Sequence, residues 1–465
     1  MEAVDVDIKS LKIGAISFFL DIYECINTDV NTFCEAIESK ILKACERFET
    51  TAKEVTEKHG IPYQTLRLAV SPLAEIVAPL TKNFHLKPEM ILEKKEIPQK
   101  LTEIMFKIAY TLQNTSKELK IDFVGGFSAC AEGGLSKKSL AIIATIPEIL
   151  ASTENIFAFV NVGSSKTGLN MDAIRLMGDA VIKLANLTAG SKGFGNLKLL
   201  TTANVPLDTP YLPASHHNRS YPDKGIGLNF YILHVIKNAL ETLGKDSNFE
   251  EIYNKIKTTT YKAVRKADII GREIAEKAGV SYFGVDISLA PWLEIENSSI
   301  AEVIECMGIE AFGTHGTTTA LFILNEAVKR GALMGSNKTV GYSGAMFPVA
   351  EDVGIIKAVK NNKLTIDKLE ALVSVCSLGL DTIPIPGDTP LETVCGIISD
   401  TLSIGILHNK SLGLRIFLIP GAKAGDIVDL EPPFENIPIM PISKISSKFF
   451  HKKGNIPPPI SSLKG

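Results

Sequence analysis

Apolar residues recur along this chain in two alternating patterns. Between residues 30 and 55 they return every three or four positions, which predicts an amphipathic helix that Gly60 terminates. Elsewhere, short continuous apolar runs such as residues 12–20 predict strands that are buried on both faces. The two patterns follow each other over most of the chain.

The alternation predicts a mixed fold of strands and helices. Further strands are predicted at residues 65–70, 121–127, 158–162, 196–203, 281–289 and 412–419. Further helices are predicted at residues 100–119, 169–187, 249–278, 300–307, 317–330, 366–376 and 390–402. Strands that alternate with helices of this length are typical of βαβ units, so we predict an α/β fold with a largely parallel sheet.

The chain contains no linker-like stretch that would divide its middle. We therefore predict one large α/β domain over residues 1–430. Residues 431–465 differ in composition because they are rich in proline, with Pro432-Pro433 and three consecutive prolines from Pro457. We expect this tail to wrap over the surface of the domain.

Charge and composition exclude several classes of protein. The 49 Lys and Arg residues against 52 Asp and Glu residues leave a net charge of −3, and no basic stripe predicts nucleic-acid binding. Mean hydropathy is +0.16, yet charged residues or proline interrupt the longest apolar runs, so we predict no membrane span. The seven scattered cysteines and the absence of a signal-peptide pattern at the start indicate a reducing, cytoplasmic setting.

Three turns rich in Gly, Ser and Thr precede predicted helices, at residues 125–134, 161–168 and 313–319. Backbone N–H groups at a helix N-terminus can bind a phosphate or carboxylate, although such residues also serve as ordinary caps. Neither a Walker A motif nor a G-x-G-x-x-G motif is present. The candidate ligand-binding residues are Gly163, Ser164, Ser165, Lys166, Thr167, Gly316, Thr317 and Thr318.

Five carboxylates are candidates for proton transfer or for binding a divalent cation such as Mg²⁺. Asp286 lies within an apolar strand pattern, where an unpaired charge is costly. Glu351 and Asp352 follow a glycine-rich segment, and Asp381 and Asp388 flank a segment whose prolines restrict the backbone. The alternative for Asp388 is that it caps the helix predicted to begin at Pro390, and the two roles do not exclude each other.

Two further candidates carry nitrogen or sulfur. His315 stands in a Gly/Thr turn at a helix start, where it could donate a hydrogen bond to a substrate oxygen. Cys376 ends an apolar helix pattern close to Asp381, which would discourage ionisation of the thiol. His216 and His217 fall in a stretch predicted to be an exposed loop, where adjacent side chains rarely bind one metal ion.

Several motifs in fixed order resemble those of the UPF0210 (DUF711) family of uncharacterised proteins, often labelled "PFL family". The motifs are GGFS at 125–128, VNVGS at 160–164, DAIRLMG at 172–178, DISLAP at 286–291, GTT at 316–318, VCSLGLD at 375–381 and IPGDTP at 385–390. The resemblance covers almost the whole chain. It implies a ten-stranded α/β barrel like that of pyruvate formate-lyase, built from two half-barrels and surrounded by helices, and a homodimer.

The resemblance implies no known reaction, and no glycyl radical is expected. The stretch around Arg415 lacks the glycine of a radical loop, and no Cys-Cys pair occurs. The chain also departs from the family pattern at Thr314-His315 and over residues 211–227, which look more polar.

Together these features predict an enzyme that acts on a small anionic metabolite by non-radical acid/base or metal-assisted chemistry. The alternative is a non-catalytic protein that binds a metabolite and has a regulatory role. In both cases the sequence does not identify a cofactor, and a divalent metal ion is one possibility.

Overall fold

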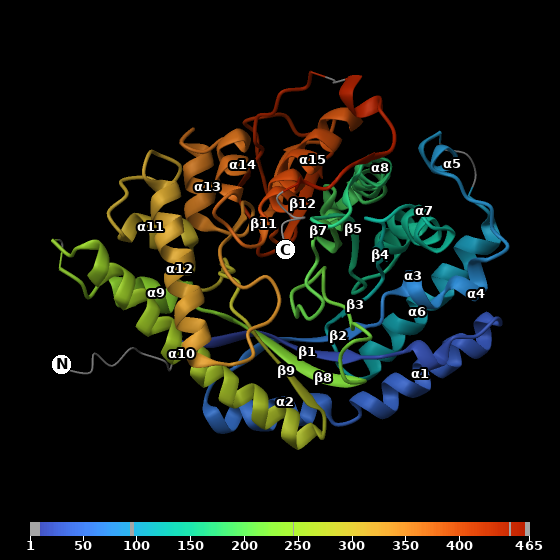
Figure 1. Ribbon diagram of the computed structural model, residues 1–465, viewed down its shortest axis with the longest axis horizontal. Coiled ribbons are helices and arrows are strands. Elements are labelled where there is room, and N and C mark those ends of the chain that lie inside the picture. Colours follow the sequence, from blue (N-terminus) through green and yellow to red (C-terminus); the bar gives the residue numbers. More distant parts are fainter. Residues whose placement is uncertain (1–9, 94–96, 245, 446–447, 461–465) are drawn as a thin grey trace.

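The computed structural model describes residues 10–93, 97–244, 246–445 and 448–460, and it shows an α/β fold in which helices surround two large β-sheets, beside a small sheet of two strands (Figure 1). The strands are β1 (Lys12–Leu20), β2 (Tyr63–Val70), β3 (Phe123–Gly125), β4 (Ala129–Cys130), β5 (Ala158–Ser164), β6 (Gly168–Asn170), β7 (Leu199–Ala203), β8 (Lys224–Tyr231), β9 (Ser281–Asp286), β10 (Met346–Pro348), β11 (Gly379–Pro386), β12 (Leu412–Ile419), β13 (Ile427–Val428), β14 (Ile437–Pro438) and β15 (Asn455–Ile456). The α/β class predicted from the sequence is confirmed.

Helices cover the outer faces of both sheets. They are α1 (Val30–Cys45), α2 (Phe48–His59), α3 (Leu73–Ile76), α4 (Ala78–Thr81), α5 (Pro88–Leu92), α6 (Gln99–Glu118), α7 (Lys137–Ser152), α8 (Met171–Leu187), α9 (Leu233–Leu240), α10 (Phe249–Ala278), α11 (Ile300–Cys306), α12 (Thr317–Gly335), α13 (Val353–Lys360), α14 (Ile366–Val373) and α15 (Leu391–Leu407). Helix α10 has the predicted bounds because a capping box at Asn248 starts it and left-handed Gly279 ends it.

Each sheet combines strands of opposite direction. In the first sheet, β3, β2 and β1 are parallel, β8 pairs antiparallel with β1, and β9 is parallel to β8. In the second, β10, β11 and β12 are parallel, β7 pairs antiparallel with β12, and β5 is parallel to β7. Over these five strands each, the two sheets share one pattern, three parallel strands followed by two of the opposite direction. The second sheet also contains the short strands β4, β6 and β15.

Single β-bridges connect the edges of the two sheets. Val124 of β3 pairs in parallel with Ile156, just before β5, and Leu289, just after β9, pairs in parallel with Ala345, just before β10. Among the described residues, ladder pairing itself does not run continuously around a closed barrel. The observed architecture is a mixed α/β fold with two facing sheets.

The strands form the core because both of their faces are covered. Every residue of β11 and β12 is buried, and in β1 only Lys12 is exposed. Outside the sheets, α10 packs against α12, and α8 packs between α7 and α15. This burial on both faces explains why these strands have continuous apolar runs rather than alternating patterns.

The connection between β7 and β8 corrects one expectation. Figure 1 shows this loop (green) in the middle of the molecule, and residues 209–217 are all buried. His216 and His217 are 2% and 0% exposed, so the prediction of an exposed loop was wrong. A Cβ on Gly125 would lie 2.3 Å from the carbonyl oxygen of Ser215, so only glycine lets the loop pass this close to β3.

The proline-rich tail contributes to the folded core where it is described. Phe434, Ile437 and Ile439 are buried, β14 pairs with β13, and β15 pairs with β6. Residues 446–447 and 461–465 lie outside the described part. In the described residues, no helix is long and apolar enough to cross a membrane.

Candidate functional site

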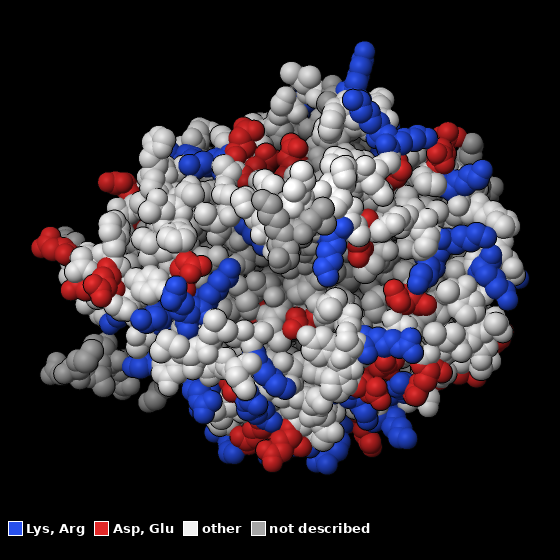
Figure 2. Space-filling model, viewed as in Figure 1, with Lys and Arg blue, Asp and Glu red and all other residues white. Residues whose placement is uncertain are grey.

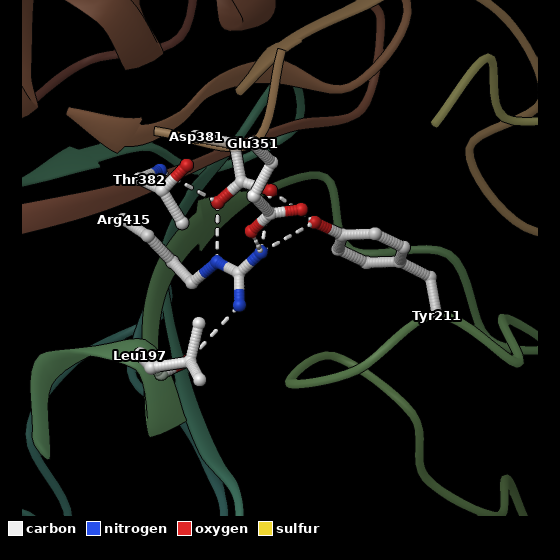
Figure 3. A network of polar contacts seen from close by, with 6 residues as sticks. All are labelled: Leu197, Tyr211, Glu351, Asp381, Thr382 and Arg415. Atoms are coloured by element: carbon white, nitrogen blue, oxygen red, sulfur yellow. Dashed lines mark hydrogen bonds and ion pairs between the residues drawn. The ribbon is translucent and has the colours of Figure 1, made fainter. Parts of the chain in front are cut away.

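A buried network of charged side chains lies on adjacent strands of the second sheet. Arg415 on β12 is 5% exposed and Asp381 on β11 is fully buried. The Arg415 guanidinium donates from Nε to Asp381 Oδ1 and from Nη2 to Asp381 Oδ2 over 2.6 Å, a bidentate pair. Figure 3 shows the carboxylates of Asp381 and Glu351 on one side of this guanidinium and Leu197 on the other.

A bulge in β11 shapes the position of Asp381. The pairing of β11 with β12 skips between Leu380 and Ile383, and Thr382 has a φ of +44°, which is costly for a β-branched residue. The Thr382 N–H donates to Asp381 Oδ1 over 2.9 Å. Strain of this kind is often found where a strand directs a side chain into a functional site.

Tyr211 and Glu351 complete the network. The Tyr211 hydroxyl donates to Asp381 Oδ2 and accepts from Arg415 Nη2 over 3.1 Å. Glu351 Oε1 accepts from Arg415 Nη2 over 3.2 Å, and Arg415 Nη1 donates to the carbonyl of Leu197 over 3.0 Å. No described residue donates a hydrogen bond to Glu351 Oε2.

The two carboxylates of this network differ in their electrostatic environment. Asp381 holds the bidentate pair with Arg415, whereas Glu351 shares that cation at one oxygen only. Burial, followed by repulsion from Asp381, raises the pKa of Glu351 to about 7, although Arg415 opposes the shift. Burial also raises the pKa of Tyr211, so its hydroxyl stays neutral and can donate.

The network forms part of the wall of a cavity of about 620 Å³, the first cavity. It lies at the carboxyl ends of β8 and β10 and at the amino ends of β2 and β3, where Tyr231, Glu351, Thr65 and Phe123 line it. Carboxyl ends of parallel strands are common ligand sites in α/β proteins. Its aromatic lining residues are Phe123, Phe157, Phe194, Tyr211, Tyr231, Trp292 and Phe434.

Two more cations line the first cavity. Arg67 on β2 donates to the hydroxyl of Thr65 and to the carbonyl of Pro210, and no described carboxylate forms an ion pair with it. Burial lowers the pKa of Arg67. Lys198 donates to the carbonyls of Leu150 and Thr153, and burial lowers its pKa to about 8. A ligand anion would give Arg67 the partner that the protein does not supply.

Two of the candidate carboxylates have structural hydrogen bonds instead. Asp352 caps α13 and accepts from Ser299 Oγ and from the N–H groups of Ile300, Gly354 and Ile355. Asp286 accepts from Ser288 Oγ and N and from the N–H of Tyr342. Burial raises the pKa of both to about 6, and neither lines the first cavity.

The remaining candidates lie away from Asp381. Asp388 is exposed and pairs with Lys444, and α15 has no side-chain cap, so the predicted capping role of Asp388 was wrong. His315 is exposed at the start of α12. Cys376 is buried, and burial raises the pKa of its thiol to about 11.

Two of the three predicted anion-binding turns meet at one place. Glu132, from residues 125–134, lines a second cavity together with Ser164 and Lys166, whereas no residue of the turn at 313–319 lines it. The Ser165 N–H donates to Asn204 Oδ1, and the Thr167 N–H donates to Ser164 Oγ. Gly163 belongs to β5. At α12, Gly316 is the cap, Thr317 Oγ1 accepts from the N–H of Gly313, and Thr318 follows in the first turn. These turns thus use much of their hydrogen-bonding capacity internally.

Among the described residues, no three His, Cys, Asp or Glu side chains lie together in a way that could hold a metal ion. Sequence reasoning missed Arg415, Tyr211 and Arg67 as site residues. Arg415 could have been found, because it is the one charged residue in an otherwise apolar strand, and Arg67 is likewise flanked by leucines on both sides. Tyr211 carries no such signal, since it stands in an irregular segment.

Comparison with known proteins identifies the family. A family model described as "Uncharacterised ACR (DUF711)" matches residues 6–431. UPF0210 proteins from Methanocaldococcus jannaschii and Methanosarcina barkeri are 37% and 38% identical to this chain over 459 residues, 98% of the chain and 97% and 96% of the relatives. A UPF0210 protein from Desulforudis audaxviator is 36% identical over 456 residues, 98% of the chain and 96% of that relative. The chain therefore belongs to the UPF0210 (DUF711) family.

Proposed function

We propose that this protein is an enzyme whose active site is the first cavity, and that Glu351 transfers a proton there to or from a small anionic substrate. The observation that carries the proposal is the state of Glu351. It is buried at the cavity wall, its pKa is raised to about 7, and its Oε2 receives no hydrogen bond from a described residue. A carboxyl group with this pKa can both take and return a proton at neutral pH.

Substrate binding rests on Arg67 and the aromatic wall. Arg67 has guanidinium donors available to a carboxylate or phosphate and no ion-pair partner among the described side chains. The aromatic side chains around it favour a substrate that also has an apolar or planar part. The substrate class is therefore a small organic acid with an apolar group.

Glu351 is held in position by Arg415, which is itself fixed by Asp381 and Tyr211. The bidentate pair keeps the guanidinium fixed, and its Nη2 holds Glu351 Oε1 in place. In the forward step Glu351 accepts a proton from the substrate as a base, and in the reverse step it returns that proton as an acid. Protein donors bind the carboxylate oxygens of Asp352, Asp286 and Asp381. The geometry therefore favours Glu351 as the group that carries out acid/base chemistry.

Three broader features are proposed with it. We propose that the two sheets form one ten-stranded barrel like that of pyruvate formate-lyase, because parallel bridges at Val124 and Leu289 link their edges. A homodimer is proposed from the family resemblance and is tested by the mass in solution. A cytoplasmic location is proposed because all seven cysteines are free thiols.

The experiment uses a metabolite extract, since the substrate is unidentified. The wild-type protein and the variants Glu351→Gln and Asp388→Asn are incubated with the extract, and mass spectrometry follows the consumption of anionic compounds. We expect the wild type and Asp388→Asn to consume the same compound and Glu351→Gln to be slower by about 10²–10⁴-fold.

Other outcomes contradict the proposal. Equal turnover by Glu351→Gln excludes Glu351 as the proton-transfer group. Binding of a compound by the wild type without turnover supports the alternative of a metabolite-binding regulatory protein.

A further inference from the structure

A second cavity, of about 500 Å³, lies at the other end of the strands. Gln64 and Thr65 at the start of β2 line the first cavity, whereas Pro72, just after β2, lines the second. Likewise, Phe157 before β5 lines the first and Ser164 at the end of β5 lines the second. The second cavity therefore occupies the carboxyl ends of strands whose amino ends reach the first.

His216 is a buried side chain with an unused acceptor in this cavity. It is 2% exposed, packs against Phe159 with ring centroids 5.0 Å apart, and lines the second cavity. Its Nδ1 lies 2.9 Å from the carbonyl oxygen of Ala214, and a carbonyl can only accept, so Nδ1 carries the proton. Burial lowers the pKa of His216, which keeps the ring neutral. Nε2 is thus an acceptor, and no described residue donates to it.

Cations and a second acceptor line the same cavity. Lys166, in the turn after β5, and Arg219, which lies over the ring of Tyr23, form no ion pair with a described carboxylate. Glu132 contributes a buried Oε2 that has no hydrogen-bond donor among the described residues. Glu75 also lines the cavity and accepts from the Tyr23 hydroxyl.

We propose that the second cavity is a separate binding site for a small hydroxylated anion, such as a phosphorylated polyol. Lys166 and Arg219 bind the charged group, and His216 Nε2 and Glu132 accept hydrogen bonds from hydroxyl groups. The free acceptors favour a ligand that donates hydrogen bonds, and the cations favour a ligand with a negative charge. The two observations together select a small anion that carries hydroxyl groups. The proposal does not depend on the function of the first cavity, because none of these residues lines it.

The test is calorimetric titration with glycerol 3-phosphate as the ligand, with inorganic phosphate and glycerol titrated separately. We expect saturable binding of glycerol 3-phosphate, weaker binding of phosphate and none of glycerol. Lys166→Met, on an exposed side chain, and His216→Phe, which retains the packing against Phe159, each weaken the binding by about tenfold or more. Arg67→Met, in the first cavity, leaves it unchanged.

A second measurement locates the ligand directly. In protein labelled with ¹³C at histidine Cε1, the signal that His216→Phe removes shifts on addition of glycerol 3-phosphate. Absence of saturable binding, or binding that is lost in Arg67→Met and retained in Lys166→Met, overturns the proposal. The latter result places the anion in the first cavity and leaves the proposed active site intact.

Discussion

The two cavities differ in how their charges are used. In the first, Arg415 is saturated by Asp381, Glu351 and Tyr211, and aromatic side chains form part of the wall around this network. In the second, Lys166 and Arg219 have no ion pair with a described carboxylate, and most of the residues that line the cavity are polar or charged. A protein can place similar charges at both ends of its strands, yet only those left without a protein partner remain available to a ligand.

One segment connects the two regions. The loop between β7 and β8 contributes Tyr211 and Leu212 to the first cavity and His216 and Arg219 to the second. The surface seen in Figure 2 is hollowed near its centre, and acidic and basic side chains are interspersed around the hollow. Residues 209–217 of this loop are buried, so the loop places a short packed segment between the two cavities.

The largest effect is predicted for a substitution that breaks the charged network of the first cavity. Replacing Arg415 by methionine leaves Asp381 and Glu351 buried without their cation, and we expect the free energy of unfolding to fall by about 3–5 kcal/mol. Urea unfolding measures the loss, and Lys166→Met serves as the control because its exposed side chain should leave stability unchanged. Adding Asp381→Asn to Arg415→Met should restore part of the loss. A loss below about 1 kcal/mol in Arg415→Met would contradict the buried network.

A smaller loss is expected at Asp352, which has a structural role. Asp352→Ala removes the cap of α13 and leaves the N–H of Ile300 without its acceptor, so unfolding should become easier by about 2–4 kcal/mol. Ligand binding at both cavities should persist in the folded variant. Loss of binding at unchanged stability would instead place Asp352 in a site.

The pH dependence of stability tests whether the pKa of Glu351 is raised in the folded protein. Its pKa is raised from 4.5 to about 7 in the folded protein, so between these values the folded state binds more protons than the unfolded state. Stability should therefore fall as the pH rises through this window, by about 1–3 kcal/mol for this group. In Glu351→Gln the fall should be smaller. The slope that remains comes from other carboxyl groups whose pKa values are raised by burial, namely Glu370 to about 7, Asp286 and Asp352 to about 6, and Asp400. An unchanged profile contradicts a buried Glu351 with a raised pKa.

The smallest effect is predicted at Asp388. Its side chain is 72% exposed and pairs only with Lys444 at the surface. Asp388→Asn should leave the melting temperature and both binding activities unchanged within error, because surface ion pairs contribute little. A measurable loss of binding in this variant would show that a cavity extends to this surface.

Much of the fold could be predicted because strands and helices leave local patterns. The bounds of β1, β12 and α10 agree with the sequence, since each has a continuous apolar run or clear caps. The predicted helix over residues 30–55 is interrupted after Cys45. Gly379–Pro386 is a buried strand that was not predicted, because its prolines are untypical of a strand. Proline is tolerated in a strand with a bulge and irregular pairing, but the sequence pattern does not reveal that a bulge is present.

The candidate site could be predicted only in part. Glu351 was a candidate because it follows a glycine-rich segment, and Asp381 because it borders a segment whose prolines restrict the backbone. The structure brings both carboxylates to one guanidinium. Asp388 was paired with Asp381 on sequence proximity alone, but the intervening strand separates them. Which turns share a cavity depends on the crossing of distant strands, as with Ser164 and His216, and no local pattern encodes that.

The most direct test of the proposed active site is the fluorescence of Trp292. This is the only tryptophan in the chain, and it lines the first cavity. A panel of small carboxylic acids with aromatic or branched groups is titrated into the wild type and into Arg67→Met while the emission is followed. We predict a saturable change in the wild type for at least one acid and an affinity at least about tenfold lower in Arg67→Met. If no acid in the panel gives a saturable change, or if Arg67→Met binds equally well, the first cavity is not the site of a small anionic substrate held by Arg67.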